Sequence, residues 1–235
     1  DNKPGAGGVV AGDAVAKAAP DGYTLLLMSN GTAVSAGLFK SLPFDTAKDF
    51  APVSTLGFFD LSIVVADNSR FKTLGELLAY ARANPGKLNV GTINVGSTQN
   101  LAAELFKTSA GVDVQVVPFN GTPAVITALR GGQIDAAVEI LSPVVPQINA
   151  RALRALAVMG EKRSATLPDV PTVAESGLKG FNVASWNAVA APAKTPAAVV
   201  QRLNREIQAA LKTPEVQKQL LAMHIEARGG SPEQL

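Results

Sequence analysis

The segment from Gly91 to Asn100 contains the residues whose types and spacing are best suited to chemistry. It is rich in glycine, hydroxyl and amide groups, and it lies between an apolar run and a helical pattern. Such a loop directs backbone N–H groups at one point, where a helix N-terminus adds about half a positive charge. The spacing is close to that of a phosphate-binding loop, but Ser97 stands where that loop has lysine. The segment therefore favours a carboxylate, which amides and hydroxyls alone can hold.

Groups that perform catalysis are scarce in this chain. It has one histidine, His224, and no cysteine, which excludes a Cys–His pair and thiolate metal sites. No G-x-S-x-G sequence is present, so a hydrolase nucleophile of that type is excluded. The run of glycines at 5–8 begins like a dinucleotide fingerprint, but Val10 replaces its third glycine, and a tight turn is the better interpretation. We expect no enzyme, no cofactor and no metal site.

Composition limits the partners of the chain. The 235 residues include 21 basic and 19 acidic side chains, a net charge of +2, and the basic residues are scattered. With only 5% aromatic residues, this distribution argues against nucleic-acid binding. No apolar run approaches the length that spans a bilayer.

The local patterns predict alternating helices and strands. A capping box at Thr73 opens a helix that extends to about Ala83. Further helices are expected after four hydroxyl–proline pairs: Thr122-Pro123, Ser142-Pro143, Thr195-Pro196 and Thr213-Pro214. Seven apolar runs have the length of strands: residues 23–28, 62–66, 87–90, 114–117, 135–138, 153–158 and 183–190. This alternation indicates an α/β architecture with helix-covered sheets.

Two strands rich in small residues, near 90–91 and 184–185, are the expected crossings between two lobes. Residues 1–91 and 185–235 would then form lobe 1, and residues 92–184 would form lobe 2. A two-lobed α/β protein of this kind has a cleft between its lobes.

Several segments, in order along the whole chain, resemble the Bug family, the extracytoplasmic solute receptors (TctC) of tripartite tricarboxylate transporters. The most specific is Leu-Pro-Asp-Val-Pro-Thr-Val-Ala-Glu-Ser-Gly at residues 167–177. The other matching segments lie at 4–8, 19–26, 42–50, 121–124, 131–135, 153–158 and 185–192.

The resemblance implies a two-lobed type II periplasmic-binding-protein fold that closes on a ligand in the cleft. Family members bind small carboxylates, including di- and tricarboxylates, amino acids and aromatic acids. They deliver them to a membrane permease or report them to a sensor protein. We therefore expect a periplasmic, monomeric receptor with no nucleic-acid partner. Family chains begin earlier and continue further, so we expect a piece cut at both ends that is poorly soluble or labile alone.

The resemblance assigns ligand-binding residues to two loops of the second lobe. The first loop contains Gly96, Ser97, Thr98 and Gln99. The N-terminus of the helix that follows this loop would bind one carboxylate. The family often has histidine at the next position, where this chain has Asn100 and so lacks a titratable group.

The second loop is usually Tyr-Lys-Gly-Thr in the family. Here Asn120 replaces the lysine and removes a cation, so the hydroxyl of Thr122 and backbone N–H groups would contribute more. A plain helix N-cap is an equal interpretation of Thr122, and both roles are compatible.

Three further residues complete the expected site. Glu139 lies at the carboxyl end of a strand, where the family often has aspartate. It would accept a hydrogen bond from a ligand hydroxyl, an ammonium or a water, or else bond across the lobes on closure. Trp186 would wall the cleft or pack the hinge, and Asn30, with Ser29, would end a strand facing the cleft.

Two other classes of protein stay open at this point. One is a ligand-sensing regulatory domain on the same fold, for which an upstream helix-turn-helix would be diagnostic. The other is an enzyme that uses the cleft, whose catalytic dyad would have to come from outside these residues.

Overall fold

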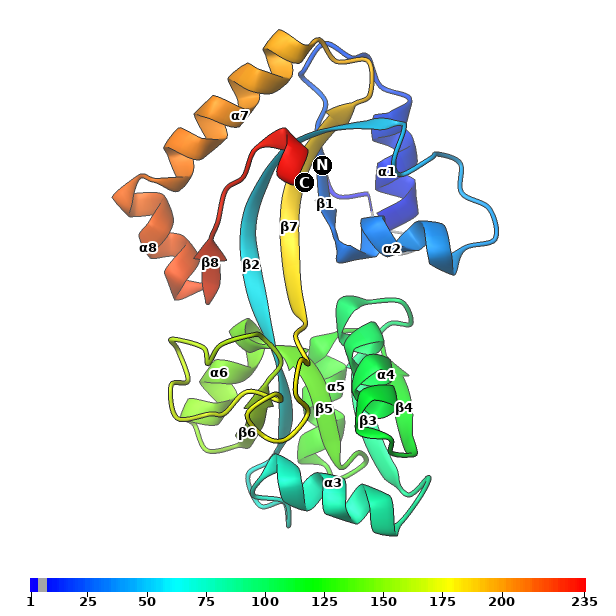
Figure 1. Ribbon diagram of the computed structural model, residues 1–235, viewed down its shortest axis with the longest axis vertical. Helices are drawn as coiled ribbons and strands as arrows, with labels where there is room; N and C mark the ends of the chain where they lie inside the picture. The colour runs from blue at the N-terminus through cyan, green and yellow to red at the C-terminus, as the bar shows by residue number, and fades with distance from the viewer. Residues whose placement is uncertain (4–7) are drawn as a thin grey trace. The chain divides into compact units, whose positions relative to one another are not determined.

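The computed structural model describes residues 1–3 and 8–235 and divides into two compact units (Figure 1). Unit 1 comprises Asp1–Phe58 and Ser185–Leu235, and unit 2 comprises Phe59–Ala184. The chain passes between the units after Phe58 and after Ala184, whereas the sequence predicts these crossings after residues 91 and 184. Residues 59–91 belong to unit 2 because their strands pair with strands of that unit.

Unit 2 is built on a mixed five-stranded sheet. In spatial order its strands are β6 (Leu153–Val158), the second half of β2 (Phe50–Ala66), β5 (Ala136–Ile140), β3 (Leu88–Ile93) and β4 (Val114–Phe119). Strand β3 runs parallel to β4 and β5, whereas β2 is antiparallel to β5 and β6. The carboxyl ends of β3, β4 and β5 therefore lie along the same edge of this sheet.

Helices cover both faces of this sheet. They are α3 (Leu74–Ala83), α4 (Thr98–Ala110), α5 (Thr122–Arg130) and α6 (Leu141–Asn149). Alternate residues of β2 separate two apolar cores: Ile63 and Val65 pack with α3 and α4, while Val64 packs with α5 and α6. This division follows from the two-residue period of a strand buried on both faces.

Unit 1 is a smaller sheet with helices around it. Its strands are β1 (Leu26–Ser29), β7 (Ala184–Pro192), the first half of β2, and β8 (Ile225–Ala227). Its helices are α1 (Val9–Ala16), α2 (Asn30–Leu38), α7 (Ala197–Leu211), α8 (Pro214–Ala222) and the 3₁₀ helix η2 (Pro232–Gln234). Strand β1 pairs antiparallel with β7, and Leu26, Met28 and Phe50 form part of a core with α1.

The structure contains elements that the local patterns do not indicate. Helix α2, strand β8 and the first half of β2 were not expected, and β1 begins at Leu26 and not at Tyr23. The tight turn expected at the glycine run includes residues 4–7, which lie outside the described residues. In the described part of the chain, no helix is long and apolar enough to cross a membrane.

Candidate functional site

The loop between β3 and α4 has the form that the sequence predicts. Ser97 is the N-cap of α4, and its Oγ accepts a hydrogen bond from the backbone N–H of Asn100 at 3.1 Å. Gly96 has φ of 80°, a left-handed conformation that glycine adopts without a steric penalty. Thr98 and Gln99 form the first turn of the helix. Because the first N–H groups of a helix have no intrahelical acceptor, this turn presents donors to an anion.

Asn100 fixes this loop to the sheet. Its Oδ1 accepts from the backbone N–H of Gly96 at 3.1 Å, and its Nδ2 donates to Thr92 Oγ1 at 3.2 Å. Both Asn100 and Thr92 are buried. From the sequence, Asn100 is recognised only as the replacement of a histidine, and its role in holding the loop is missed. A buried amide three residues after an N-cap serine is the signal that points to it.

The structure brings three of the predicted residues together around one carboxyl group. Glu139, near the end of β5, is completely buried, with 0% of its surface exposed. Its Oε2 accepts hydrogen bonds from Thr122 Oγ1 at 3.1 Å and from Gln99 Nε2 at 3.4 Å. Its Oε1 is buried with no hydrogen-bond partner among the described residues. Both partners belong to unit 2. The contact with a ligand group or water, or across the lobes on closure, that is expected of Glu139 stays a prediction.

Burial raises the pKa of Glu139 from its ordinary value of 4.5 to about 7. Removing the charged carboxylate from water is the cause, since desolvation disfavours the ionised form. Hydrogen bonds from Gln99 and Thr122 oppose this effect, as does the nearby backbone N–H of Ile140. The Ile140 N–H stabilises the ionised form of Glu139, although it makes no hydrogen bond to Oε1. Glu139 therefore exchanges its proton near neutral pH.

The start of α5 differs from one of the two expectations for Thr122. The N-cap of α5 is Gly121, with φ of 88°, and no side chain caps this helix. The N-cap interpretation of Thr122 is therefore wrong: Thr122 is the first helical residue, and its hydroxyl donates to Glu139. Asn120 precedes this turn and is exposed.

The remaining two predicted residues lie in unit 1 and contact each other. Asn30 is the first residue of α2, and its Oδ1 accepts from the backbone N–H of Trp186 at 2.9 Å and from Ser185 Oγ at 3.3 Å. Trp186 is half-buried and packs against the core that contains Met28. A role in ligand contact stays a prediction for both residues.

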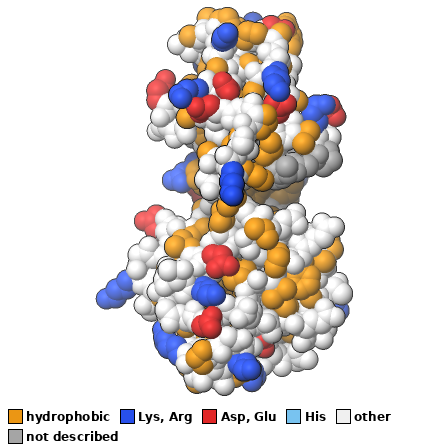
Figure 2. Space-filling view, turned by 90° about the vertical axis from the view of Figure 1, so that its right-hand side faces the viewer, with side chains coloured by type: hydrophobic (Ala, Val, Ile, Leu, Met, Phe, Trp, Pro, Cys, Tyr) orange, Lys and Arg blue, Asp and Glu red, His pale blue; other side chains and the backbone are white. Residues whose placement is uncertain are grey.

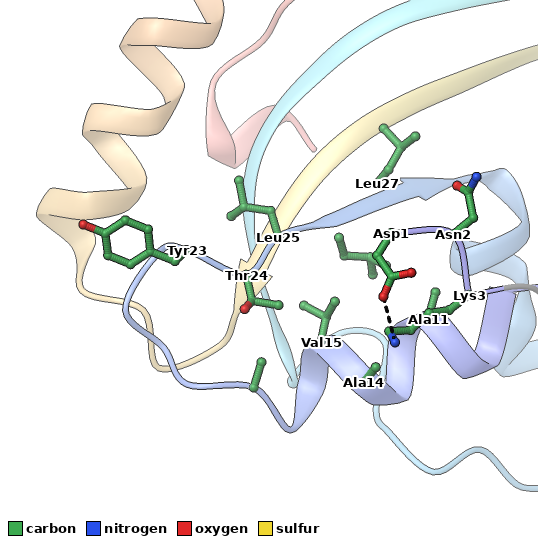
Figure 3. A pocket seen from close by; sticks show the side chains of 12 residues that line it. Asp1, Asn2, Lys3, Ala11, Ala14, Val15, Tyr23, Thr24, Leu25 and Leu27 are labelled. Carbon is green, nitrogen blue, oxygen red and sulfur yellow. Dashed lines mark ion pairs between the residues drawn. The ribbon is translucent and has the colours of Figure 1, made fainter.

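Unit 1 also has a pocket that none of the predicted residues lines (Figure 3). Its volume is about 820 Å³, and it follows β1 and α1. An ion pair joins Lys3 Nζ and Asp1 Oδ2 at 3.0 Å beside it. Leu27 on β1 is 64% exposed, and β1 is the edge strand of its sheet. This hollow therefore lies at an exposed sheet edge, lined by apolar side chains of β1 and α1 and by the polar residues Asp1, Asn2 and Lys3.

The surface has the mixed charge that the composition predicts. Figure 2 shows basic and acidic side chains interspersed on the face in view, and its described residues form no continuous basic surface. Within the described ranges, no group of His, Cys, Asp and Glu residues could hold a metal ion. The arrangement in unit 2 is suited to holding a small anion at helix N-termini through backbone N–H and hydroxyl groups.

The chain belongs to the family described as the tripartite tricarboxylate transporter family receptor, TctC, whose model matches residues 1–235. It is 38% identical over 236 residues to the UPF0065 protein in the tcbD-tcbE intergenic region of Pseudomonas sp. strain P51, covering 100% of this chain and 70% of that protein. It is 37% identical to BugT of Bordetella pertussis, covering 92% of this chain and 67% of BugT. The family indicated by the motifs is thus confirmed.

Solved structures confirm the fold class. R. palustris Rpa4515 with adipate has a TM-score of 0.90 and 34% identity, covering 100% of this chain and 79% of that one. The periplasmic binding protein BugD has a TM-score of 0.86 and 31% identity, covering 99% and 79%. MatC from Rhodopseudomonas palustris with bound malate has a TM-score of 0.82 and 32% identity, covering 95% and 76%. The chain has the α/β fold of these two-lobed solute-binding proteins.

Proposed function

We propose that this chain is the ligand-binding part of a periplasmic receptor that captures a small carboxylate for the membrane permease of a tripartite tricarboxylate transporter. Two related proteins of the same fold are known with adipate and with malate, both dicarboxylates. Di- and tricarboxylates, amino acids and aromatic acids are the candidate ligands. The observation that carries the proposal is the start of α4, where a serine-capped helix N-terminus follows a glycine turn.

One carboxylate of the ligand would be held at the first turn of α4. The backbone N–H groups of Thr98 and Gln99 and the hydroxyl of Thr98 would be the donors. The Ser97 hydroxyl donates to the Ile93 carbonyl at 3.4 Å, so it would join them only by exchanging that partner for the ligand. None of the predicted site residues is a lysine or arginine. A singly charged carboxylate oxygen pair suits such a site better than a phosphate, which carries more charge and is usually met by a cation.

Capture would include closure of the two units on the ligand, as the family resemblance implies, with the receptor acting as a monomer. Small-angle X-ray scattering tests this part separately. A carboxylate that binds is expected to reduce the radius of gyration without changing the molecular mass. An unchanged radius at saturating ligand would argue against closure but not against binding.

Isothermal titration calorimetry against a panel of carboxylates tests the proposal. The panel contains succinate, malate, adipate, citrate, glutamate and benzoate, with inorganic phosphate as the comparison anion. We expect at least one carboxylate to bind with a Kd in the micromolar range or below, about −8 kcal/mol, and phosphate to bind far more weakly. If no carboxylate gives a binding heat or raises the melting temperature, the receptor proposal is contradicted.

A substitution in the loop tests the assignment of the α4 start. Thr98→Trp fills the space in front of the first helical turn, and we expect it to weaken carboxylate binding by about a hundredfold or more, a loss of about 2.7 kcal/mol. Thr108→Trp is the matched control, because Thr108 is an exposed threonine near the other end of the same helix. Equal affinities of the two variants would refute this location of the site.

A further inference from the structure

Glu139 is a carboxyl group buried without a cation. None of the ion pairs formed by the described residues includes it, and one of its oxygens has no partner. An isolated buried charge is costly and normally requires a paired group or neutralisation by a proton. Burying it at the end of β5 therefore costs stability.

The position of Glu139 links the starts of two helices. Gln99 is the second residue of α4 and Thr122 is the first residue of α5, and both donate to the same oxygen, Oε2. These donors lie 40 and 17 residues from Glu139 in the chain. A shared, buried acceptor holds the first turns of the two helices in a fixed relation.

We propose that Glu139 is a proton-linked positioning residue of the carboxylate site: neutral Glu139 admits the anionic ligand, and ionised Glu139 opposes it. The inference rests on the proposed function. Both helix N-termini favour one negative charge nearby, and an ionised Glu139 already supplies it. A ligand carboxylate then meets like-charge repulsion, which protonation of Glu139 removes. By linkage, binding of the ligand favours uptake of a proton by the same factor.

Few other charged side chains lie on the elements that surround Glu139. Strands β2 and β3 and helices α4, α5 and α6 pack against β5. The titratable side chains on these elements are Asp60, Glu104, Lys107 and Arg130. Asp60 lies against Gly160, Lys107 pairs with Asp113 at 3.5 Å, and the other two are exposed. The pKa of Glu139, raised to about 7 by burial, supports a response within the neutral range.

Calorimetric titrations with adipate and succinate at about pH 6.5 and about pH 8.5 test the inference, since both probes are ionised throughout this range. The wild type is expected to bind about fivefold or more tightly at the lower pH. Its binding heat should depend on the ionisation enthalpy of the buffer, because a proton is taken up.

Substitutions of Glu139 distinguish its role as a hydrogen-bond acceptor from the effect of its charge. Glu139→Gln keeps an acceptor for Gln99 and Thr122 but has no charge, so it should bind equally at both pH values, with about the affinity of the wild type at the lower one. Glu139→Ala removes the acceptor and should bind about tenfold or more weakly at both. Glu104→Gln, which removes an exposed charge from α4, should keep the wild-type pH profile.

The outcomes distinguish this inference from the function on which it rests. Binding of adipate or succinate by the wild type with no pH dependence, or an unchanged pH profile in Glu139→Gln, overturns the inference alone. Failure of the wild type to bind any carboxylate overturns both. Carbon NMR of the ligand-free protein adds a direct readout: the side-chain carboxyl of Glu139 should titrate near pH 7, and titration below about pH 5 would also overturn the inference.

Discussion

At the scale of single residues, Glu139 couples folding stability to pH. Its pKa is 4.5 in an ordinary setting and about 7 in the fold, so the folded state binds the proton more tightly than the unfolded chain. The associated stabilisation is fully present below about pH 4.5 and is lost as the pH rises through about 7. This rise in the pKa of Glu139 corresponds to about 3 kcal/mol of stability.

We therefore predict that the free energy of unfolding falls by about 2.5 kcal/mol between about pH 5 and about pH 8, and that Glu139→Gln removes most of this dependence. Urea denaturation followed by circular dichroism at both pH values measures it, with Glu104→Gln as the control. Asp45 and Glu175, whose hydrogen bonds lower their pKa values, affect stability only at lower pH. A wild-type stability that is flat across this interval would contradict the burial of an uncompensated carboxyl group.

At the scale of elements, the loop between β3 and α4 depends on Asn100. The predicted effect of Asn100→Ala is a loss of about 1–3 kcal/mol of stability, since the Gly96 N–H and the Thr92 hydroxyl lose their buried partner. Carboxylate affinity should fall as well, because the loop that presents the donors is released. Asn84→Ala is the comparison: it removes an amide that donates to the Tyr80 carbonyl at the end of α3, away from this loop. Equal affinity in the two variants would show that Asn100 does not shape the site.

Elements with strong local signals are the ones that the sequence predicts well. The capping box at Thr73 forms as expected, with Glu76 as its partner, and β6 has the predicted bounds. Helix α2 escapes prediction because Asn30–Leu38 is rich in small residues and has little apolar periodicity. The first half of β2 contains Pro52 and Gly57, residues that are unfavourable in strands, and tertiary pairing overrides this local preference.

The site shows the same division between local and long-range signals. The Ser97 cap and the glycine turn before it lie within a few residues of each other, so the sequence pattern predicts them. The contacts of Glu139 with Gln99 and Thr122 join three separate strand-to-helix connections, and no local pattern specifies which side chains meet there. The position of these residues at the carboxyl ends of strands indicates that they lie near one another, but it does not indicate which side chains form hydrogen bonds.

At the scale of the whole molecule, the fold is shared with proteins whose sequences differ from this one at most positions. Solved relatives with 31–34% identity have TM-scores of 0.82–0.90. The common architecture therefore identifies the family, and we expect loop side chains such as Asn100 and Asn120 to influence which ligand is preferred. The predicted site residues occur in both units, and their part in ligand preference stays a prediction.

A crystal structure of the protein with the carboxylate that binds most tightly tests the central claim most directly. We predict that one carboxylate of the ligand lies within hydrogen-bond distance of the backbone N–H groups and hydroxyls at Ser97, Thr98 and Gln99. A bound carboxylate that makes no contact with the first turn of α4 would contradict the claim.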